Sequence, residues 1–367
     1  MTTTARHVLE RIARGPTVGP DERRVLSGVF DRCAVLRTDL ERAVASGALR
    51  RIVLDGARTP SVDPFDAVGG ALILPRGPVD SVDEPEIAFL LGHGLHRAVI
   101  VAGTIAMRDE IGALAHGIAR ARPQIGRHGP HRDYSGVVDG LVVVHEFDEA
   151  RAQIAGWNAS VEFHRSVLGE LAPEDLAHGP RADDVLRGSR LAARPRPPFT
   201  LERDLTLAPT PRNLDAMLRV RVRRPPERAA LGPEGTSDHA NLAGAVAVGF
   251  VCRVNRSHHP RSGTASEVAV ALDLSTHALD PALLLANGID LGTDRAPVPY
   301  LDVGPEPRRR GRFHHTIGRN DPVGFTRRAA RSSTSIESDP RIIGGDARRG
   351  GTRGSSGRRN GHDGLAR

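Results

Sequence analysis

The sequence predicts an α+β protein in which a small sheet packs on a histidine-bearing helix and on a later glutamate-bearing helix. Short strand-like runs at 50–56 and 71–75 lead into a long apolar helical run at 85–101. A second long helical run covers 137–169 and carries acidic residues near its start. Residues 305–367 have no sustained hydrophobic period and are rich in Gly, Ser and Arg, which is typical of a disordered tail.

The N-terminal segment, residues 1–49, is predicted to be helical. Apolar residues recur at helical spacing over 5–14 and over 21–48, and a glycine stands near each end of the longer run. The strand-like runs "RRIVLDG" and "ALILP" follow, separated by a turn-rich connection with Pro and Gly. The acids and prolines of "PVDSVDEPE" then indicate the start of the helix at 85–101, because helix N-termini favour both.

The chain divides further where its composition changes. Residues 50–170 form the predicted core, which includes another amphipathic helix at 107–122. Residues 171–200 are rich in Pro and Arg and predict a linker or surface loop. A second α/β part at 201–304 completes the domain, and the tail begins at 305.

The second part has predicted elements of its own. Residues 210–222 begin as a helix, and 266–292 predict an alternating strand followed by a short helix. Between them, 231–255 pass from a polar loop into the apolar run "LAGAVAVGFVC", which we expect to be a strand. In the first part, "PQIGRHGPHRDYSG" at 123–136 predicts a loop.

The positive charge of the chain is concentrated in its tail. All 51 basic residues are arginines, and the formal net charge is +7. From Glu306 onward 15 arginines stand against 6 acids, whereas residues 1–305 carry 36 arginines against 38 acids. A nearly neutral body argues against nucleic-acid binding except through the tail. The tail itself has two interpretations, a nucleic-acid-binding arm or out-of-frame translation of a GC-rich gene.

Compartment and redox signals are sparse. Cys33 and Cys252 lie far apart and form no metal motif, so they imply no disulfide framework, although a bond between them stays open. The N-terminus lacks the apolar core of a signal peptide, and no apolar run reaches membrane-spanning length. We therefore expect a protein that is cytoplasmic in the producing cell and makes no membrane contact. Export by a signal-independent secretion system stays open.

The stretch "EIAFLLGHGLHRAVIVAG" at 86–103 carries the first chemical signal. A zinc peptidase of the HExxH type needs two histidines four apart on one helix, with a glutamate after the first as general base. His93 fits the first ligand, but Gly94 occupies the general-base position and Arg97 the position of the second histidine. His96 stands three residues after His93, near the same helical face, and offers a substitute ligand. Histidines on helices are more often structural, so this stretch alone is weak evidence for a metal.

The later helix supplies a candidate third ligand. The stretch "DEARAQIAGWNA" at 148–159 places Glu149 in the early turns of the helix predicted at 137–169. Zinc peptidases of the glutamate type take their third ligand from a helix that follows the metal helix. The candidate metal set is therefore His93, His96 and Glu149, and the cofactor it would hold is zinc.

At this point the chain resembles a family of metallopeptidase-type toxin domains that occur in bacterial polymorphic toxins and secreted effectors. Four segments carry the resemblance: "VDPFDAVGGALILP", "FLLGHGLHRAV", "DEARAQIAGWNA" and "LGPEGTSDHANLAGAVAVG". The family patterns read like "LGHELxHA", "DEAxAEIAGWNA" and "LGxxGxSDYxNYYGAWAVG". The resemblance covers roughly residues 50–300, with His239 and Leu242 standing where the family has tyrosines.

The resemblance implies a zincin-like fold, a zinc cofactor, and a protein or peptide substrate, with an immunity protein as a possible partner. It matches His93 to the first ligand and Glu149 to the third. It matches Gly94 and Arg97 to the base and the second histidine by position only. Glycine cannot accept a proton, and arginine stays charged and repels a cation. We expect weak or no zinc binding and little or no proteolysis. If water is activated at all, Glu110 or Glu146 are the candidate substitute bases.

Other residues suggest chemistry less specifically. Ser237, Asp238 and His239 are the residue types of a hydrolase triad, but neighbours in sequence rarely converge, and no GxSxG elbow is present. We expect Asp238 and Asn241 to support the fold by bonding to backbone. Trp157, the only tryptophan, is expected to pack its helix on the core.

Three functions compete at this stage. The first is a toxin-type metallopeptidase domain, impaired or inactive at its metal motif. The second is a non-enzymatic binding or decoy protein with the same fold, which the missing base favours. The third is a nucleic-acid-binding protein that acts through the arginine-rich tail.

Overall fold

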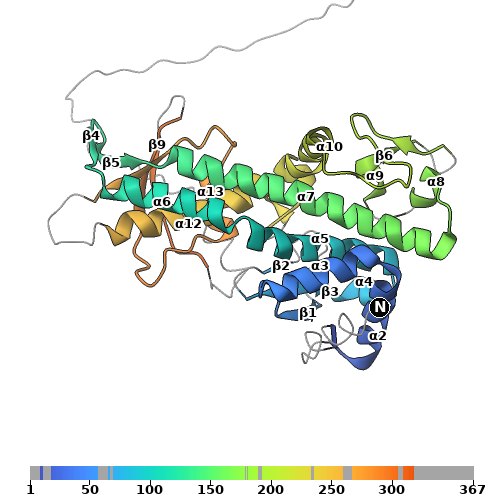
Figure 1. Ribbon diagram of the computed structural model, residues 1–367. Coiled ribbons are helices and arrows are strands. Elements are labelled where there is room, and N and C mark those ends of the chain that lie inside the picture. The colour runs from blue at the N-terminus through green and yellow to red at the C-terminus, as the bar shows by residue number, and fades with distance from the viewer. Residues whose placement is uncertain are drawn as a thin grey trace, which may run out of the picture.

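The computed structural model shows a mostly helical α+β protein (Figure 1). It describes residues 9–10, 18–56, 65–66, 69–177, 179, 181–188, 192–232, 235–258, 267–304 and 309–317. Most of the helix predicted at 5–14 lies outside the described residues, as does the chain from 318 to 367. Among the described helices none is long and apolar enough to span a bilayer.

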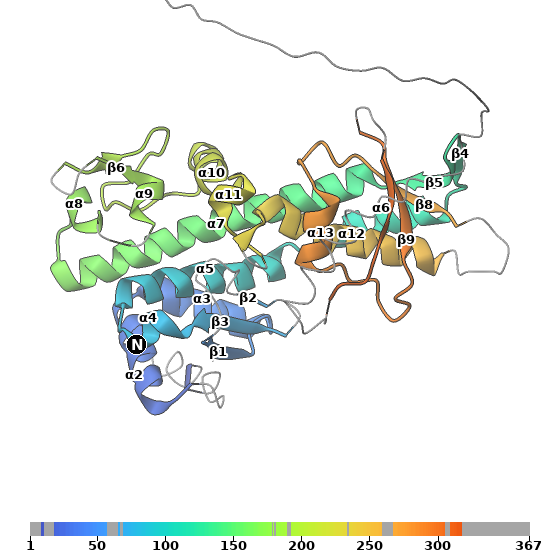
Figure 2. The same cartoon turned by 180° about the vertical axis from the view of Figure 1, so that it is seen from behind.

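One long helix, α7 (Ser135–Leu168), organises the molecule (Figure 1). At a rise of about 1.5 Å per residue it extends about 50 Å. Helix α5 (Glu84–Gly103) packs along one half of α7, and α6 (Ile105–Arg120) and α12 (His239–Ser257) pack along the other half, as the opposite views agree (Figure 2). The helices predicted at 85–101, 107–122 and 137–169 are confirmed, with ends shifted by one or two residues.

Two glycines let α5 and α7 approach closely. A Cβ atom on Gly92 would lie 2.7 Å from Cβ of Ala159, and a Cβ atom on Gly156 would lie 2.9 Å from the carbonyl oxygen of Phe89. Neither position has room for a side chain without a shift of backbone, since real Cβ atoms do not approach other atoms so closely. The close crossing of α5 and α7 therefore depends on Gly92 and Gly156. It also brings His93, the residue after Gly92, against α7.

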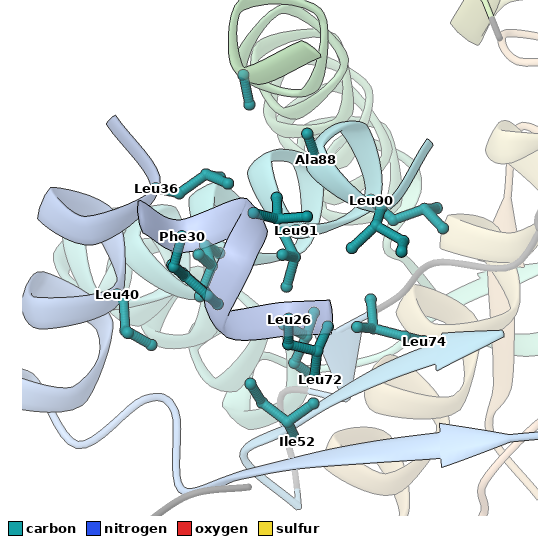
Figure 3. Packing of buried hydrophobic residues seen from close by; sticks show 14 of the residues in the cluster. Leu26, Phe30, Leu36, Leu40, Ile52, Leu72, Leu74, Ala88, Leu90 and Leu91 are labelled. Carbon is teal, nitrogen blue, oxygen red and sulfur yellow. The ribbon is translucent and has the colours of Figure 1, made fainter. Parts of the chain in front are cut away.

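The N-terminal layer covers the other side of α5. It consists of α2 (Pro20–Arg32), α3 (Ala34–Ala45), α4 (Arg76–Asp80) and a small sheet of order β1-β3-β2, with β1 at Arg51–Asp55, β3 at Ala71–Pro75 and β2 at Phe65–Asp66. Strands β1 and β3 are parallel, with Ile52 opposite Leu72. Leu26, Phe30 and Leu91 meet these strands in one apolar core (Figure 3).

The single helix predicted at 21–48 is in fact two helices with a break at Cys33. Cys33 has extended backbone angles, and the backbone N–H groups of Ala34 and Val35 donate to the Glu162 carboxylate at 2.7 and 3.1 Å. A carboxylate at a helix N-terminus satisfies donors that the helix itself leaves open. The break is therefore stabilised by a residue of α7, which the local sequence could not reveal.

A second sheet caps the far end of α7. Its strand order is β10-β9-β8-β5-β4. The strands are β4 (Gln124–Gly126), β5 (Gly129–Asp133), β8 (Ala269–Leu272), β9 (Val298–Asp302) and β10 (Arg310–Phe313). The three central strands are parallel and both edge strands are antiparallel. The predicted loop at 123–136 is therefore wrong, because it forms the β4–β5 hairpin. The predicted boundary at 304 is also too early, because β10 pairs with β9 and buries Phe313.

The third layer packs on the remaining face of α7. It begins with α8 (Pro173–Leu176), α9 (Ala182–Val185) and the strand pair β6 (Leu186–Arg187) and β7 (Arg194–Pro195). Helix α10 (Pro211–Met217) then continues as a π-helical turn (Leu218–Val222), and α11 (Pro226–Ala229) follows. The indole N–H of Trp157 donates to the carbonyl of Leu205 at 3.0 Å, which ties this layer to α7. Residues 171–200 are thus no free linker, since Leu176, Val185 and Phe199 are buried in this layer.

The apolar run at 242–252 is a helix, not the predicted strand. Asp238 caps α12 by accepting from the backbone N–H of Asn241 at 2.7 Å, and the Asn241 side chain accepts from the N–H of Asp280 at 2.9 Å. Asp280 in turn caps α13 (Pro281–Asn287). Asp238 and Asn241 therefore support the fold, as expected. The strand and short helix predicted at 266–292 are confirmed as β8 and α13.

Candidate functional site

A cavity of about 490 Å³ lies where the layers around α7 meet, with walls from α5, α6, α7 and α12. One wall is apolar and comes chiefly from α7 and α12. It is formed by Leu141, Val144, Leu242, Ala243, Val246, Ala247 and Phe250. The polar side chains that line the cavity are His93, Arg108, His145, Glu149, Gln153, Arg181, Arg221, His239, Arg253 and Asn287.

His93 and Glu149 meet in the wall of this cavity. His93 Nε2 lies 2.8 Å from Glu149 Oε1, and both side chains are almost fully buried, with 5% and 3% of their surface exposed. Gln153 donates from Nε2 to the same carboxylate oxygen at 2.7 Å. The two residues that the sequence assigned to one centre are therefore in direct contact across the α5–α7 crossing.

The carboxyl group of Glu149 is held in its ionised form. Burial opposes ionisation, but the charges of His93 and His239, the hydrogen bond from His93 and the charge of Arg97 together hold the pKa of Glu149 well below its usual value. An ionised carboxylate only accepts hydrogen bonds, so His93 carries its proton on Nε2. The other ring nitrogen, Nδ1, is buried without a hydrogen-bond partner among the described residues.

Arg97 brings a permanent positive charge into the same buried region. It lies one helical turn after His93, and its Nη2 is 3.5 Å from Nδ1 of His145. Its charge lowers the pKa of Glu149 and opposes the burial that raises the pKa of Asp148. The Arg97 guanidinium thus provides a positive charge that acts on the Glu149 carboxylate. In an HExxH site a metal ion provides that positive charge.

His96 points elsewhere. Its Nδ1 lies 3.5 Å from Oδ2 of Asp39 on α3, and it is not among the residues that line the cavity. Gly94 is buried within α5 and offers no functional group. The structure therefore brings together His93 and Glu149, and it places His96 against the N-terminal layer.

Two further histidines, which sequence reasoning did not assign to this centre, line the cavity. His145 on α7 and His239 on α12 have ring centroids 6.4 Å apart. The signal for His239 was present, because it replaces a tyrosine of the family pattern in "SDHAN". His145 carried no such signal, since its approach to His239 depends on the packing of α12 against α7.

Arginines gather at the α5 end of the cavity. The guanidinium of Arg181 stacks over the ring of Phe89 at 5.3 Å, and Phe89 stacks on His93 with ring centroids 6.3 Å apart. Nε of Arg221 lies 3.9 Å from Asp184, which Arg224 also binds. Burial first, and then the charge of Arg181, lower the pKa of Arg221 to about 10.

Glu86 lies buried beside these arginines. Burial raises its pKa to about 7, against the charges of Arg181 and Arg221, which lower it. Its Oε2 has no hydrogen-bond partner among the described residues. At neutral pH Glu86 is thus only partly ionised and compensates the arginine charge incompletely.

The alternative catalytic groups are engaged in structural contacts. The Ser237 hydroxyl accepts from Asn287 Nδ2 at 2.7 Å, and Asp238 caps α12, so these two do not form a triad with His239. Glu146 accepts two hydrogen bonds from Arg223, at 2.9 and 2.7 Å. Glu110 is exposed on α6. Both cysteines are buried and unbonded to each other.

The donor set fits zinc poorly. His93 and Glu149 offer two ligand groups that are bonded to each other, and the position of the second histidine holds the cation Arg97. In the described part of the chain no three His, Cys, Asp or Glu side chains are grouped as a metal site. Comparison of the chain with protein-family models, with curated proteins and with solved structures finds no match in any of the three.

Proposed function

We propose that this chain is a zincin-like, metallopeptidase-type toxin or effector domain whose centre works without zinc and binds a peptide rather than cleaving it. The observation that carries the proposal is the buried contact between His93 and Glu149, with Gly94 and Arg97 at the two remaining key positions. The helix order supports it too, because a histidine-bearing helix is crossed by a later glutamate-bearing helix.

The loss of hydrolysis follows from the chemistry of the side chains. Peptide hydrolysis needs a base close to the attacking water, and Gly94 has no proton-accepting side chain. Glu149 has the wrong protonation behaviour for that role, because its low pKa makes it a weak base that is already bonded to His93. Arg97 keeps the region positively charged and repels a cation.

The cavity supports retention of a binding role. Its volume of about 490 Å³ is within the usual range for ligand sites, which is roughly 300–1,000 Å³. An apolar wall with a few polar groups opposite is the common composition of such sites. Exposed Val246 on α12 extends the apolar wall to the surface, with 71% of its area accessible.

A chymotryptic digest of casein tests the proposal, because it offers many peptides that end in apolar residues. The full chain, supplied with zinc, is equilibrated with the digest, and bound and free peptides are identified by mass spectrometry. We expect a subset of peptides to be retained intact. New cleavage products that a chelator suppresses would contradict the proposal, and so would the absence of any retained peptide.

A matched pair of variants locates the binding site. Val246→Trp fills the mouth of the cavity from an exposed position and should abolish retention. Leu114→Trp, on α6, changes an exposed apolar residue that does not line the cavity and should leave retention unchanged. Equal retention by both variants would place binding outside the cavity.

A further inference from the structure

We infer that the cavity recognises the free carboxyl terminus of a peptide with an apolar last residue, and that Arg221 binds the terminal carboxylate. This inference rests on the proposed function and makes the ligand specific. It follows from the charge balance at one end of the cavity, from the unpartnered polar atoms of its lining, and from its apolar wall.

The charge balance at the α5 end favours an anion. Arg181 and Arg221 both line the cavity there and repel each other. The acid nearest to Arg221, Asp184, lies 3.9 Å away and is shared with Arg224. Glu149 also attracts Arg221 but is hydrogen-bonded to His93 and Gln153, and Glu86 is incompletely ionised. A ligand carboxylate would bring a further negative charge to the largely buried guanidinium of Arg221, where such a bond is strong.

Arg221 is the arginine best suited to receive that carboxylate. Its side chain is only 13% exposed, and its Nε is covered by protein 3.9 Å from Asp184, so the terminal N–H groups of the guanidinium are the ones that a ligand would meet. A guanidinium presents several N–H groups in one plane, which matches the two oxygens of a carboxylate. The charges of two other arginines in the lining are neutralised by closer carboxylates. Arg253 pairs with Asp290 at 3.0 Å and Arg108 with Asp148 at 3.4 Å.

The same lining offers partners for a peptide group. Asn287 donates from Nδ2 to Ser237, and its Oδ1 is buried against Gly232 without a partner in the described structure, so the side chain would have to turn for Oδ1 to accept from a peptide N–H. His93 Nδ1 is a second buried polar atom without a partner there. A buried polar atom that gains a hydrogen bond on binding favours a ligand with matching groups. A peptide satisfies this requirement better than a purely apolar molecule does.

The size of the cavity indicates that the peptide ends within it. A volume of about 490 Å³ is that of a bounded small-ligand site, whereas an extended peptide in mid-chain needs an open groove. The apolar wall with Leu242, Ala243 and Phe250 lies opposite the polar groups and suits an apolar side chain. A terminal carboxylate, one peptide group and an apolar residue together use all three features.

Calorimetric titration of the full chain with N-acetyl-Ala-Ala-Leu and with its C-terminal amide tests the inference. The two peptides differ only in the terminal charge. Because a hydrogen bond to a charged group contributes about 1.5–3 kcal/mol, we expect the free acid to bind about 10- to 100-fold more tightly than the amide. Arg221→Gln should reduce this ratio to about one, while Arg219→Gln, which alters an exposed arginine that pairs with Asp215 and does not line the cavity, should preserve it.

The outcomes separate the inference from the proposed function. If acid and amide bind the wild type equally, the terminal-carboxylate inference is overturned although peptide binding stands. If neither binds while dodecanoate does, the anion site stands but its ligand is not a peptide. Binding of neither peptide nor dodecanoate overturns both proposals. Retained amide binding by Arg221→Gln shows that this variant is folded, and an unchanged acid-to-amide ratio in it would exclude Arg221 from the site.

Discussion

At the scale of residues, Arg97 is the clearest departure from the HExxH pattern. Its guanidinium lies in the buried region where Glu149 and Asp148 need a positive charge. The sequence assigned His93 and Glu149 to one metal site, and their side chains are in direct contact because a single helix crossing joins them. It did not predict the position of His96. Residues three and four after His93 differ by about 100° around a helix, and only the fourth faces α7 here.

Loss of the Arg97 charge should destabilise the protein. Arg97→Gln leaves the carboxylates of Glu149 and Asp148 with less compensation in a buried region, and we expect the free energy of unfolding to fall by about 3 kcal/mol. Urea denaturation measures the change. Arg24→Gln, which breaks an exposed pair with Asp21, is the control and should change stability by less than about 0.5 kcal/mol. Equal effects of the two substitutions would show that the Arg97 charge has no structural role.

Glu86 should make the protein less stable as the pH rises. Its folded-state pKa of about 7 exceeds the ordinary value of 4.5, so the folded state binds its proton more tightly, and the resulting stabilisation is lost as the pH rises through 7. Glu86→Gln removes that loss. We expect the variant to exceed wild type in stability by about 2–3 kcal/mol near pH 8 and by much less near pH 5. Thermal unfolding at both pH values tests this, and a difference independent of pH would refute it.

At the scale of elements, the crossing of α5 and α7 fixes the site. Helix existence was predictable here from long periodic patterns, but the close approach at Gly92 and Gly156 was not, because either glycine could equally have served as a helix end. The run at 242–252 was predicted as a strand since Ala, Gly and Val give no clear period. Its helical form depends on the cap at Asp238 and on burial against α6, α7 and α13.

Two glycine substitutions in α7 should have opposite effects. Gly156→Ala places a Cβ atom 2.9 Å from the Phe89 carbonyl oxygen, so we expect a loss of about 1–3 kcal/mol in stability. Gly140→Ala meets only Cδ1 of Ile111 at 3.7 Å, an ordinary contact, and should stabilise the helix by up to about 1 kcal/mol. Chemical denaturation of both variants measures these changes. A neutral effect of Gly156→Ala would mean that the helices lie farther apart than described.

At the scale of the whole molecule, three apolar cores share α7 and leave the cavity at their junction. The α+β class was predictable from the sequence, and so were the first small sheet and the order of the helices around it. Residues 171–200 were predicted as a linker or surface loop; the linker alternative failed, and so did the predicted boundary at 304, for one physical reason. Both segments are polar and rich in arginine, yet their few apolar residues, such as Phe199 and Phe313, are buried by contacts distant in sequence.

Truncation tests where the folded chain ends. A chain that ends at Ile317 keeps β10, whereas a chain that ends at Gly304 loses it together with Phe313, which stacks on Tyr300 at 4.3 Å. Loss of a buried phenylalanine costs about 3–5 kcal/mol, so the shorter chain should unfold about 5–15 °C below the longer one. Equal melting temperatures of the two chains would show that the folded domain ends at residue 304.

The central proposal is that this centre works without zinc, with the charge of Arg97 acting on Glu149, and zinc content tests it most directly. The full wild-type chain and the double variant Gly94→Glu, Arg97→His are each dialysed with zinc, then freed of excess metal and analysed by mass spectrometry. We expect the wild type to retain essentially no zinc and the double variant to hold about one zinc per chain through His93, the new histidine and Glu149. About one zinc per chain in the wild type, lost on His93→Ala, would contradict the account.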